Sequence, residues 1–299
     1  MSSTPSNNPA PGSETPLLSI RDMNVSFGTY AGTVHAVRGV SLDVGREKVA
    51  IVGESGSGKS TLGRAILRLL PKFAKVSAQR MMFEGRDILA ASDKDIKAVR
   101  GQRMSMILQD PKYSLNPVLP VGRQIAEAYG VHKSVSKSAA RARALEMLEA
   151  VRIRDPERVY NMYPHELSGG MGQRVMIAMM LAPGPQFLIA DEPTSALDVT
   201  VRLQVLAVLD DLVADRGLGL LFITHDLNLV RSFCDRVLIM YAGRVVETLA
   251  ARDLDKAQHP YTRGLLGSMP RLDHPVNRLE TLSRDPSWLD RPVEGQFHD

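Results

Sequence analysis

The sequence contains one cysteine and no long run of apolar residues, and each scarcity excludes a class of protein. Cys234 has no partner within the chain, so an intrachain disulfide is excluded and a cysteine metal cluster is disfavoured. Because Cys234 lies in an apolar-periodic stretch, Leu229 to Cys234, we expect it to pack in the core. The longest apolar stretches, such as Val175 to Ala182, are much shorter than the roughly 18 residues of a transmembrane helix, so we expect no membrane span.

Neither sign of charge dominates. The chain has 37 Lys and Arg against 33 Asp and Glu, which gives a net charge of +4 and a pI near 9.2. This balance suits a protein beside an anionic membrane face, although a solvated basic surface is the simpler interpretation. Residues 1–16 are rich in Ser, Pro and Asn, without a basic start or an apolar centre, and predict a disordered tail and not a signal peptide.

A glycine-rich segment fits the phosphate-binding pattern G-x-x-x-x-G-K-[ST] between an expected strand, Val49 to Val52, and an expected helix that runs until Pro71. That helix repeats apolar residues at helical spacing, at Leu62, Ala65, Ile66 and Leu69. Backbone N–H groups of such a loop and the positive end of the helix dipole both attract phosphate. We therefore predict that the segment binds ATP, with Lys59 at the β- and γ-phosphates and Ser60 at Mg²⁺. The predicted nucleotide-binding residues are Gly53, Glu54, Ser55, Gly56, Ser57, Gly58, Lys59, Ser60 and Thr61.

A second apolar run, Phe187 to Ala190, ends in two carboxylates. Asp191 is predicted to hold Mg²⁺ through water, and Glu192 to polarise the attacking water as general base. Upstream, Ser168 and two glycines open an apolar helical stretch, which predicts a second anion site.

The segment Leu167-Ser168-Gly169-Gly170-Met171-Gly172-Gln173-Arg174 resembles the signature motif of ATP-binding cassette (ABC) ATPases, and that family's other motifs are present in order. Gln109 resembles the Q-loop glutamine and His225 the switch histidine that contacts the γ-phosphate. The resemblance implies catalytic roles for Glu192, His225 and Gln109. It implies Mg²⁺ contacts from Ser60, Gln109 and Asp191. The implied signature residues are Ser168, Gly169, Gly170 and Met171, and the implied D-loop is Ser195, Ala196, Leu197 and Asp198.

The resemblance also implies the fold: an α/β P-loop NTPase ABC cassette with a RecA-like core, an antiparallel β edge subdomain and a helical signature subdomain. We place the cassette at 17–251, its helical subdomain at about 115–182, and a C-terminal extension at 252–299. Core strands are expected at 103–108, 187–191, 219–224 and 236–241, and a helix from Ser138 to Val151 is expected to bury Ala142, Leu145, Leu148 and Val151. Asp155-Pro156 is expected to begin the next helix.

In ABC proteins an aromatic side chain from the edge subdomain stacks on adenine. Tyr30 is the candidate here, with Phe27 and His35 as neighbouring alternatives. The chain shows no internal repeat and so carries one cassette. In the family, a cassette's P-loop and signature serine lie on opposite sides of the subunit, which implies that a second cassette completes each ATP site.

Several further stretches resemble the ATP-binding subunits of bacterial importers of the oligopeptide, dipeptide and nickel uptake family. They are Gln109-Asp110-Pro111, Ser114-Leu115-Asn116-Pro117, Pro164-His165-Glu166, Asp198-Val199-Thr200-Val201, Met240-Tyr241-Ala242-Gly243-Arg244 and His259-Pro260-Tyr261-Thr262. The implied partners are a related second ATPase subunit, two transmembrane permease subunits and a solute-binding protein, with no nucleic acid. The implied location is the cytoplasmic face of the inner membrane, where the chain would be a peripheral subunit.

The cargo stays open at this point. Di- and oligopeptides are the first expectation, and nickel chelates, opines or other small solutes are the alternatives. A soluble ABC ATPase of DNA repair or translation is a remote alternative. It would need a coiled-coil or zinc insertion or a second cassette, and the sequence shows none of these. Two departures from the importer pattern matter: Gly172 replaces an Arg and is expected to loosen the signature helix, and Glu294 to His298 replace a cysteine-rich ending, so an iron–sulfur role is not supported.

Overall fold

The computed structural model describes residues 15–30, 32–131, 133–195, 197–268, 285 and 288. Its centre is a six-stranded sheet in the order β11-β10-β3-β9-β8-β7. All neighbouring strands in it are parallel except β10 and β11. The strands are β3 (Lys48–Val52), β7 (Met104–Ile107), β8 (Phe187–Asp191), β9 (Gly219–Thr224), β10 (Arg236–Tyr241) and β11 (Arg244–Ala250).

Both faces of this sheet are buried, which explains why its strands are continuous apolar runs. In β3, Val49 and Ile51 face one hydrophobic cluster and Ala50 and Val52 face another, as expected for side chains that alternate along a strand. The parallel strands end at the same edge of the sheet, so the loops that follow β3, β8 and β9 meet there.

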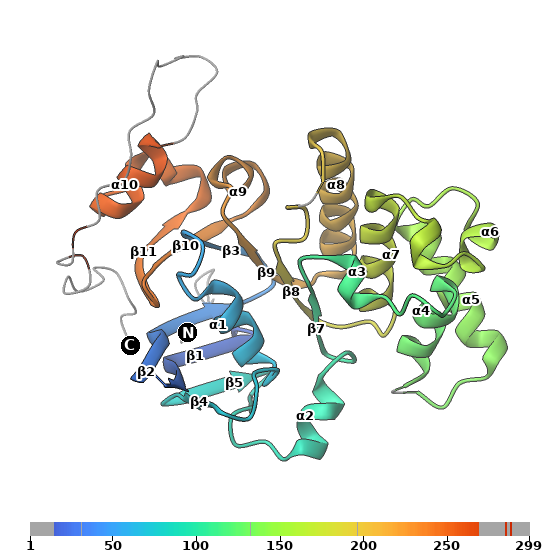
Figure 1. Cartoon of the computed structure of the whole chain (residues 1–299), viewed down its shortest axis with the longest axis horizontal. Helices are drawn as coiled ribbons and strands as arrows, with labels where there is room; N and C mark the ends of the chain where they lie inside the picture. The colour runs from blue at the N-terminus through green and yellow to red at the C-terminus, as the bar shows by residue number, and fades with distance from the viewer. Residues whose placement is uncertain are drawn as a thin grey trace, which may run out of the picture.

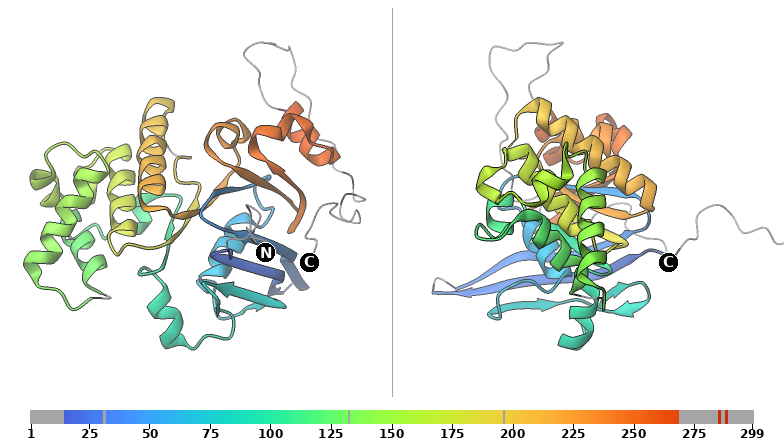
Figure 2. Two further views of the ribbon diagram at one scale, coloured as in Figure 1. Left: turned by 180° about the vertical axis from the view of Figure 1, so that it is seen from behind. Right: turned by 90° about the vertical axis from the view of Figure 1, so that its right-hand side faces the viewer.

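A second, antiparallel sheet of five strands packs on one side of this core. Helix α1 (Lys59–Ile66) lies between the two sheets (Figure 1), and its Leu62, Ala65 and Ile66 are fully buried. The hairpin of β1 and β2 extends beyond the rest of this sheet, as the right-hand view of Figure 2 shows. The strands are β1 (Leu18–Thr29), β2 (Gly32–Val44), β4 (Ala74–Ser77), β5 (Arg80–Phe83) and β6 (Arg86–Asp87), and α2 (Asp93–Val99) follows them.

Helices cover the other face of the parallel sheet and extend away from it (Figure 1). Helices α7 and α8 pack in the same hydrophobic cluster as Leu188 and Ala190 of β8. The helices are α3 (Pro111–Ser114), α4 (Val121–Gly130), α5 (Lys137–Ala150), α6 (Pro156–Tyr160), η1 (Pro164–Glu166), α7 (Gly169–Leu181), α8 (Val199–Arg216) and α9 (Leu227–Phe233). The chain continues through η2 (Ala251–Lys256) to α10 (Pro260–Gly267).

The predicted fold class, the four core strands and the helix start at Asp155-Pro156 are confirmed. Cys234 is buried in the core as predicted, and burial raises the pKa of its thiol to about 12, so the thiol stays neutral. Gly172 does not interrupt α7, which is helical from Gly169 to Leu181, so the expected loosening is not seen in the backbone. No helix among the described residues is long and apolar enough to cross a bilayer.

Two predicted helix features are wrong. Helix α1 ends at Ile66 and not near Pro71, because Arg68 adopts a left-handed φ of 51° and Leu69 donates back to the Arg64 carbonyl, which closes the helix end. Leu69 is therefore 47% exposed. Of the predicted buried face of α5, Leu148 and the C-cap residue Val151 are buried, Leu145 is half-buried and Ala142 is exposed. Ala144 and Met147 complete the buried face instead.

The predicted tail at 1–16 falls almost wholly outside the described residues, as do Ala196 and the segment Glu294 to His298. Of the expected C-terminal extension, the structure describes residues 252–268, 285 and 288.

Candidate functional site

The glycine-rich loop connects β3 in the middle of the parallel sheet to α1. Its backbone turns back on itself, with the Ser57 N–H donating to the Glu54 carbonyl at 3.2 Å. Gly58 has a φ of 102°, and a Cβ there would lie 2.2 Å from the Ala36 carbonyl oxygen. At Gly53 a Cβ would lie 2.1 Å from the Met240 carbonyl oxygen. Glycine is required at both positions because neighbouring backbone occupies the space of a side chain.

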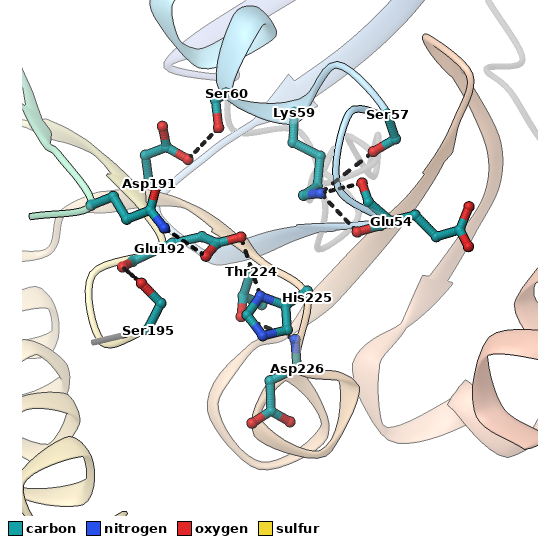
Figure 3. A network of polar contacts seen from close by, with 12 residues as sticks. Glu54, Ser57, Lys59, Ser60, Asp191, Glu192, Ser195, Thr224, His225 and Asp226 are labelled. Atoms are coloured by element: carbon teal, nitrogen blue, oxygen red, sulfur yellow. Dashed lines mark hydrogen bonds and ion pairs between the residues drawn. The ribbon is translucent and has the colours of Figure 1, made fainter. Parts of the chain in front are cut away.

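Lys59 begins α1 and turns its side chain back over the loop (Figure 3). Its Nζ donates to the carbonyls of Gly53 at 2.7 Å and Glu54 at 2.8 Å. Burial lowers the pKa of Lys59, and the nearby carboxylates of Glu192 and Asp191 oppose that shift. In this structure the Lys59 amine is held by two neutral backbone carbonyls of the loop.

Asp191, at the end of β8, points toward the start of α1, where the Ser60 hydroxyl donates to its Oδ1 at 2.8 Å (Figure 3). Burial raises the pKa of the Asp191 carboxyl, and the hydrogen bond from Ser60 opposes that shift. Two side-chain oxygens that could bind a metal ion, from Ser60 and Asp191, thus lie 2.8 Å apart.

The Glu192 side chain contacts two further polar side chains, and Figure 3 labels one of them, His225. Glu192 Oε1 lies 3.2 Å from Nδ1 of His225, which follows β9, and its Oε2 accepts from Nε2 of Gln109 at 3.4 Å. Its backbone has a left-handed φ of 45°, unusual for a residue with a side chain. A residue with a strained backbone, whose carboxylate is contacted by a histidine and an amide, is typical of a functional site.

Except for Asp191, these side chains line one cavity of about 570 Å³. It is lined by Ala36, Ser55, Gly56, Gly58, Lys59, Ser60, Thr61, Gln109, Glu192 and His225. The structure therefore brings together the predicted loop and the residues that follow β7, β8 and β9.

Tyr30 does not line this cavity. It lies at the tip of the β1–β2 hairpin with its side chain fully exposed, so the structure gives no contact between it and the site. His35 is also exposed, and Phe27 packs edge-on against Phe73. Among the described residues of this hairpin only Ala36 lines the cavity, and a small apolar side chain gives no sequence signal for such a position.

The signature residues lie elsewhere. Ser168 caps the start of α7 by accepting from the Met171 N–H at 3.4 Å, and Gly170 packs so closely that a Cβ would lie 2.3 Å from Val201 Cγ1. Ser168 and Met171 line a different cavity, of about 580 Å³. Its lining residues are Arg152, Ile153, Arg154, Ser168, Met171, Arg174, Gln204 and Val208. None of the signature residues lines the cavity at the glycine-rich loop. Gly169 lies beside Leu197 of the D-loop segment, because a Cβ at Gly169 would be 3.7 Å from Leu197 Cδ2.

The predicted D-loop begins three residues after Glu192, at Ser195. The Ser195 hydroxyl donates to the Glu192 carbonyl at 3.2 Å, and Asp198 caps α8 by accepting from the Val201 N–H at 3.0 Å. This segment thus joins the carboxylate at the first cavity to a helix that lines the second.

Gly58→Ala tests the requirement for glycine in the loop. The added Cβ meets both a left-handed φ and the Ala36 carbonyl, so we expect the free energy of unfolding to fall by about 1–3 kcal/mol and ATP affinity to be lost. Gly56→Ala is the matched control for stability, because Gly56 has a φ of 80° but no protein atom within 4 Å of the added Cβ. Gly56 itself lines the cavity, so its substitution is not a control for ATP affinity. Thermal melts of both variants and an ATP titration of Gly58→Ala check the prediction, and an equal loss of stability in the two variants would contradict the role of the Ala36 contact.

The sequence alone missed one contact to the loop. Tyr261 of α10 is completely buried, and its hydroxyl accepts from the Glu54 N–H at 3.0 Å. The two residues are 207 positions apart, and the motif around Tyr261 indicated only a resemblance to importers, with no place in the site.

The chain is similar to known proteins over most of its length. A family model described as "ABC transporter" matches residues 37–195. The chain is 48% identical over 282 residues to the dipeptide transport ATP-binding protein DppD of Bacillus subtilis, covering 93% of this chain and 84% of that protein. It is 48% identical over 286 residues to the oligopeptide transport ATP-binding protein OppD of the same organism, covering 94% and 80%.

Among solved structures, the chain is similar to the ATP-binding cassette MJ0796, determined as a dimer in a post-hydrolysis state bound to ADP and Pi. The TM-score is 0.71 at 27% sequence identity, and the match covers 79% of this chain and 99% of that one.

Proposed function

This chain belongs to the ABC transporter family, and from that premise we propose that it is the ATP-hydrolysing subunit that powers solute import, with peptides as cargo, through a membrane permease. The observation that carries the ATPase assignment is the single cavity that joins Lys59, Gln109, Glu192 and His225. The peptide assignment is supported by the names of the relatives, which are dipeptide and oligopeptide transport ATP-binding proteins.

Binding of the triphosphate begins at the loop. The amine of Lys59, which donates to the carbonyls of Gly53 and Glu54 in this structure, would turn to the β- and γ-phosphates. The N–H groups of the loop would donate to the phosphates, and the positive end of the α1 dipole would stabilise their charge. Tyr30 stays the candidate for stacking on adenine, with Phe27 and His35 as alternatives. In this structure the Tyr30 side chain is exposed, so the role requires the hairpin tip to move toward the site.

The residues beside Lys59 fit Mg²⁺. Ser60 and Asp191 present two oxygen donors, and Gln109 can add an amide oxygen, which are ligand types that Mg²⁺ prefers when it also keeps several waters. Among the described residues no group of three or more His, Cys, Asp and Glu is placed to hold a metal, so a cluster of such ligands is not the basis of this site. When bound, the metal would neutralise charge on the phosphate oxygens.

Glu192 is positioned to act on the attacking water. Its carboxylate opens onto the cavity and accepts a proton from water, while His225 and Gln109 orient it through contacts at 3.2 and 3.4 Å. His225 is then placed to donate toward the γ-phosphate as charge develops there.

A second cassette would complete the site. The signature serine and the loop line separate cavities of this chain, so we infer that Ser168 acts on the nucleotide of a partner, with a related paralogue as the expected partner. ATP binding would close the pair, and hydrolysis would open it.

We divide the chain accordingly into a cassette at 17–251, with a helical subdomain at about 115–182, and a C-terminal extension at 252–299. Two permease subunits would contact the region after Gln109, and a solute-binding protein would deliver the cargo. The cassette would then work as a peripheral subunit at the cytoplasmic face of the inner membrane.

Cargo dependence of hydrolysis tests the import function. In proteoliposomes that contain the assembled complex, we expect a peptide-loaded binding protein to raise the ATPase rate severalfold above the empty binding protein, because the permease controls closure of the cassettes. Release of phosphate from ATP is the measurement.

Gln109→Ala should reduce this stimulation more than it weakens ATP binding, since Gln109 lies between Glu192 and the segment expected to meet the permease. If peptides fail and a nickel chelate or opine stimulates, the cargo assignment is wrong and the import function stands. If no solute changes the rate, the import function itself is wrong.

A further inference from the structure

Helix α10 (Pro260–Gly267) contacts the phosphate loop through the side chain of Tyr261. Tyr261 lies on α10, which packs beside the β10–β11 edge of the parallel sheet (Figure 1), and its side chain is completely buried. Its hydroxyl accepts from the backbone N–H of Glu54, the second residue of the loop, at 3.0 Å. A residue outside the nucleotide motifs thus satisfies a backbone donor within the loop.

The bonded N–H belongs to a peptide unit with a second contact. The carbonyl of Gly53 is in the same planar unit as the N–H of Glu54, and it accepts from Lys59 Nζ at 2.7 Å. Because the unit is planar, a rotation that moves the N–H also moves the carbonyl. Tyr261 therefore fixes the direction of one of the two carbonyls that hold the Lys59 amine.

The ring of Tyr261 is itself held in place. Its centroid lies 4.5 Å from that of Tyr241 and 5.9 Å from that of Trp288, the single tryptophan, which is 7% exposed. The Tyr261 N–H donates to Nδ1 of His259, which caps α10, at 3.2 Å. The hydroxyl is thus presented to the loop by a packed aromatic cluster, Tyr241, His259, Tyr261 and Trp288.

From these contacts we propose that Tyr261 is a positioning residue for ATP binding: its hydroxyl orients the Gly53–Glu54 peptide and, through it, the resting place of the Lys59 amine. The inference rests on the proposed nucleotide site. It gives the residues after the cassette a part in that site, since α10 and Trp288 hold the ring that reaches the loop.

Tyr261→Phe removes the hydroxyl and keeps the ring. We expect the Kd and KM for ATP to rise about three- to tenfold, the range for loss of one hydrogen bond, with kcat nearly unchanged because Lys59 meets the phosphates in both ground and transition states. Titration calorimetry and steady-state kinetics measure these values. If Tyr261 only fills space, the Phe variant equals the wild type in both, and the inference is overturned.

Tyr241→Phe is the matched control. The Tyr241 ring belongs to the same cluster. Among the described residues its hydroxyl makes no hydrogen bond, so we expect unchanged ATP affinity. An equal loss in both variants would assign the effect to the cluster and overturn the specific role of Tyr261.

A measurement on the unaltered protein needs no variant to fold. In nucleotide-free wild type, the Glu54 amide should exchange its hydrogen much more slowly than an open-chain amide, because Tyr261 accepts from it. Exchange at the open-chain rate would overturn the inference. A wild-type protein that binds no ATP would instead refute the nucleotide site, whereas normal ATP binding with unaffected Tyr261→Phe refutes only the role of Tyr261.

Discussion

Glu192→Gln is expected to lower the steady-state rate of ATP hydrolysis by about 10²- to 10⁴-fold while ATP affinity changes little. The carboxylate that opens onto the cavity becomes an amide, which does not accept a proton from water. Lys59, Ser60 and Asp191 keep their places, because their described hydrogen bonds do not involve the Glu192 side chain. Phosphate release under saturating ATP and equilibrium ATP titration measure the two quantities separately.

Glu157→Gln serves as the control for this substitution. Glu157 is an exposed carboxylate on α6 that pairs with Arg141, away from the cavity, so the same chemical change there should leave hydrolysis unaltered. Near-normal turnover in Glu192→Gln would remove Glu192 from the role of general base and leave the orienting contacts with His225 and Gln109 without a catalytic purpose.

The elements around this site could be read from the sequence because local physics determines them. A parallel strand buried on both faces must be a short apolar run, so β3, β8, β9 and β10 are visible as sequence segments. The parallel ladder then puts the ends of β3, β8 and β9 at one edge, which brings Lys59, Glu192 and His225 together.

Features that depend on single dihedral angles or distant packing could not be read in this way. Arg68 ends α1 early because its backbone is left-handed, a conformation that is usually predicted from a glycine, and there is no glycine at this position. The buried face of α5 is set by its contacts with α4 and α7, which selected Ala144 in place of the predicted Ala142. Tyr261 reaches Glu54 only because tertiary folding brings residues 207 positions apart into contact.

The placement of Tyr30 shows a different limit. A hairpin can be recognised from strands in which apolar and polar residues alternate. The direction of its tip, however, depends on the twist of the strands and on shifts of register along the β1–β2 pair. Here three register shifts occur along the pair, and the tip carries Tyr30 into solvent while Ala36 faces the cavity. Residue type therefore suggested an aromatic contact whose geometry the sequence did not contain.

Ser168→Asp is expected to reduce hydrolysis by at least about 10²-fold, the cost of losing a donor aimed at the transition state, without weakening ATP binding at the chain's own loop. Asp is as good a helix N-cap as Ser, so it can still accept from the Met171 N–H and preserve α7. It replaces a hydroxyl donor by a negative charge, which would repel the phosphates of a partner's nucleotide. The defect is therefore expected between subunits and not within one.

Subunit association separates these two locations. When the chain is purified without its paralogue, we expect two copies to pair with each other. With the Glu192→Gln background preventing hydrolysis, ATP should then convert dilute monomers into closed pairs, seen as a doubling of mass by light scattering, and Ser168→Asp should abolish that change. Ser136→Asp is the matched control, because Ser136 caps α5 in the same manner by accepting from the Ala139 N–H, away from both cavities. In the wild type, activity per subunit should rise with protein concentration. A demonstrably monomeric sample with full activity would show that one chain completes its own site, and Ser168 would then have no partner's nucleotide to act on.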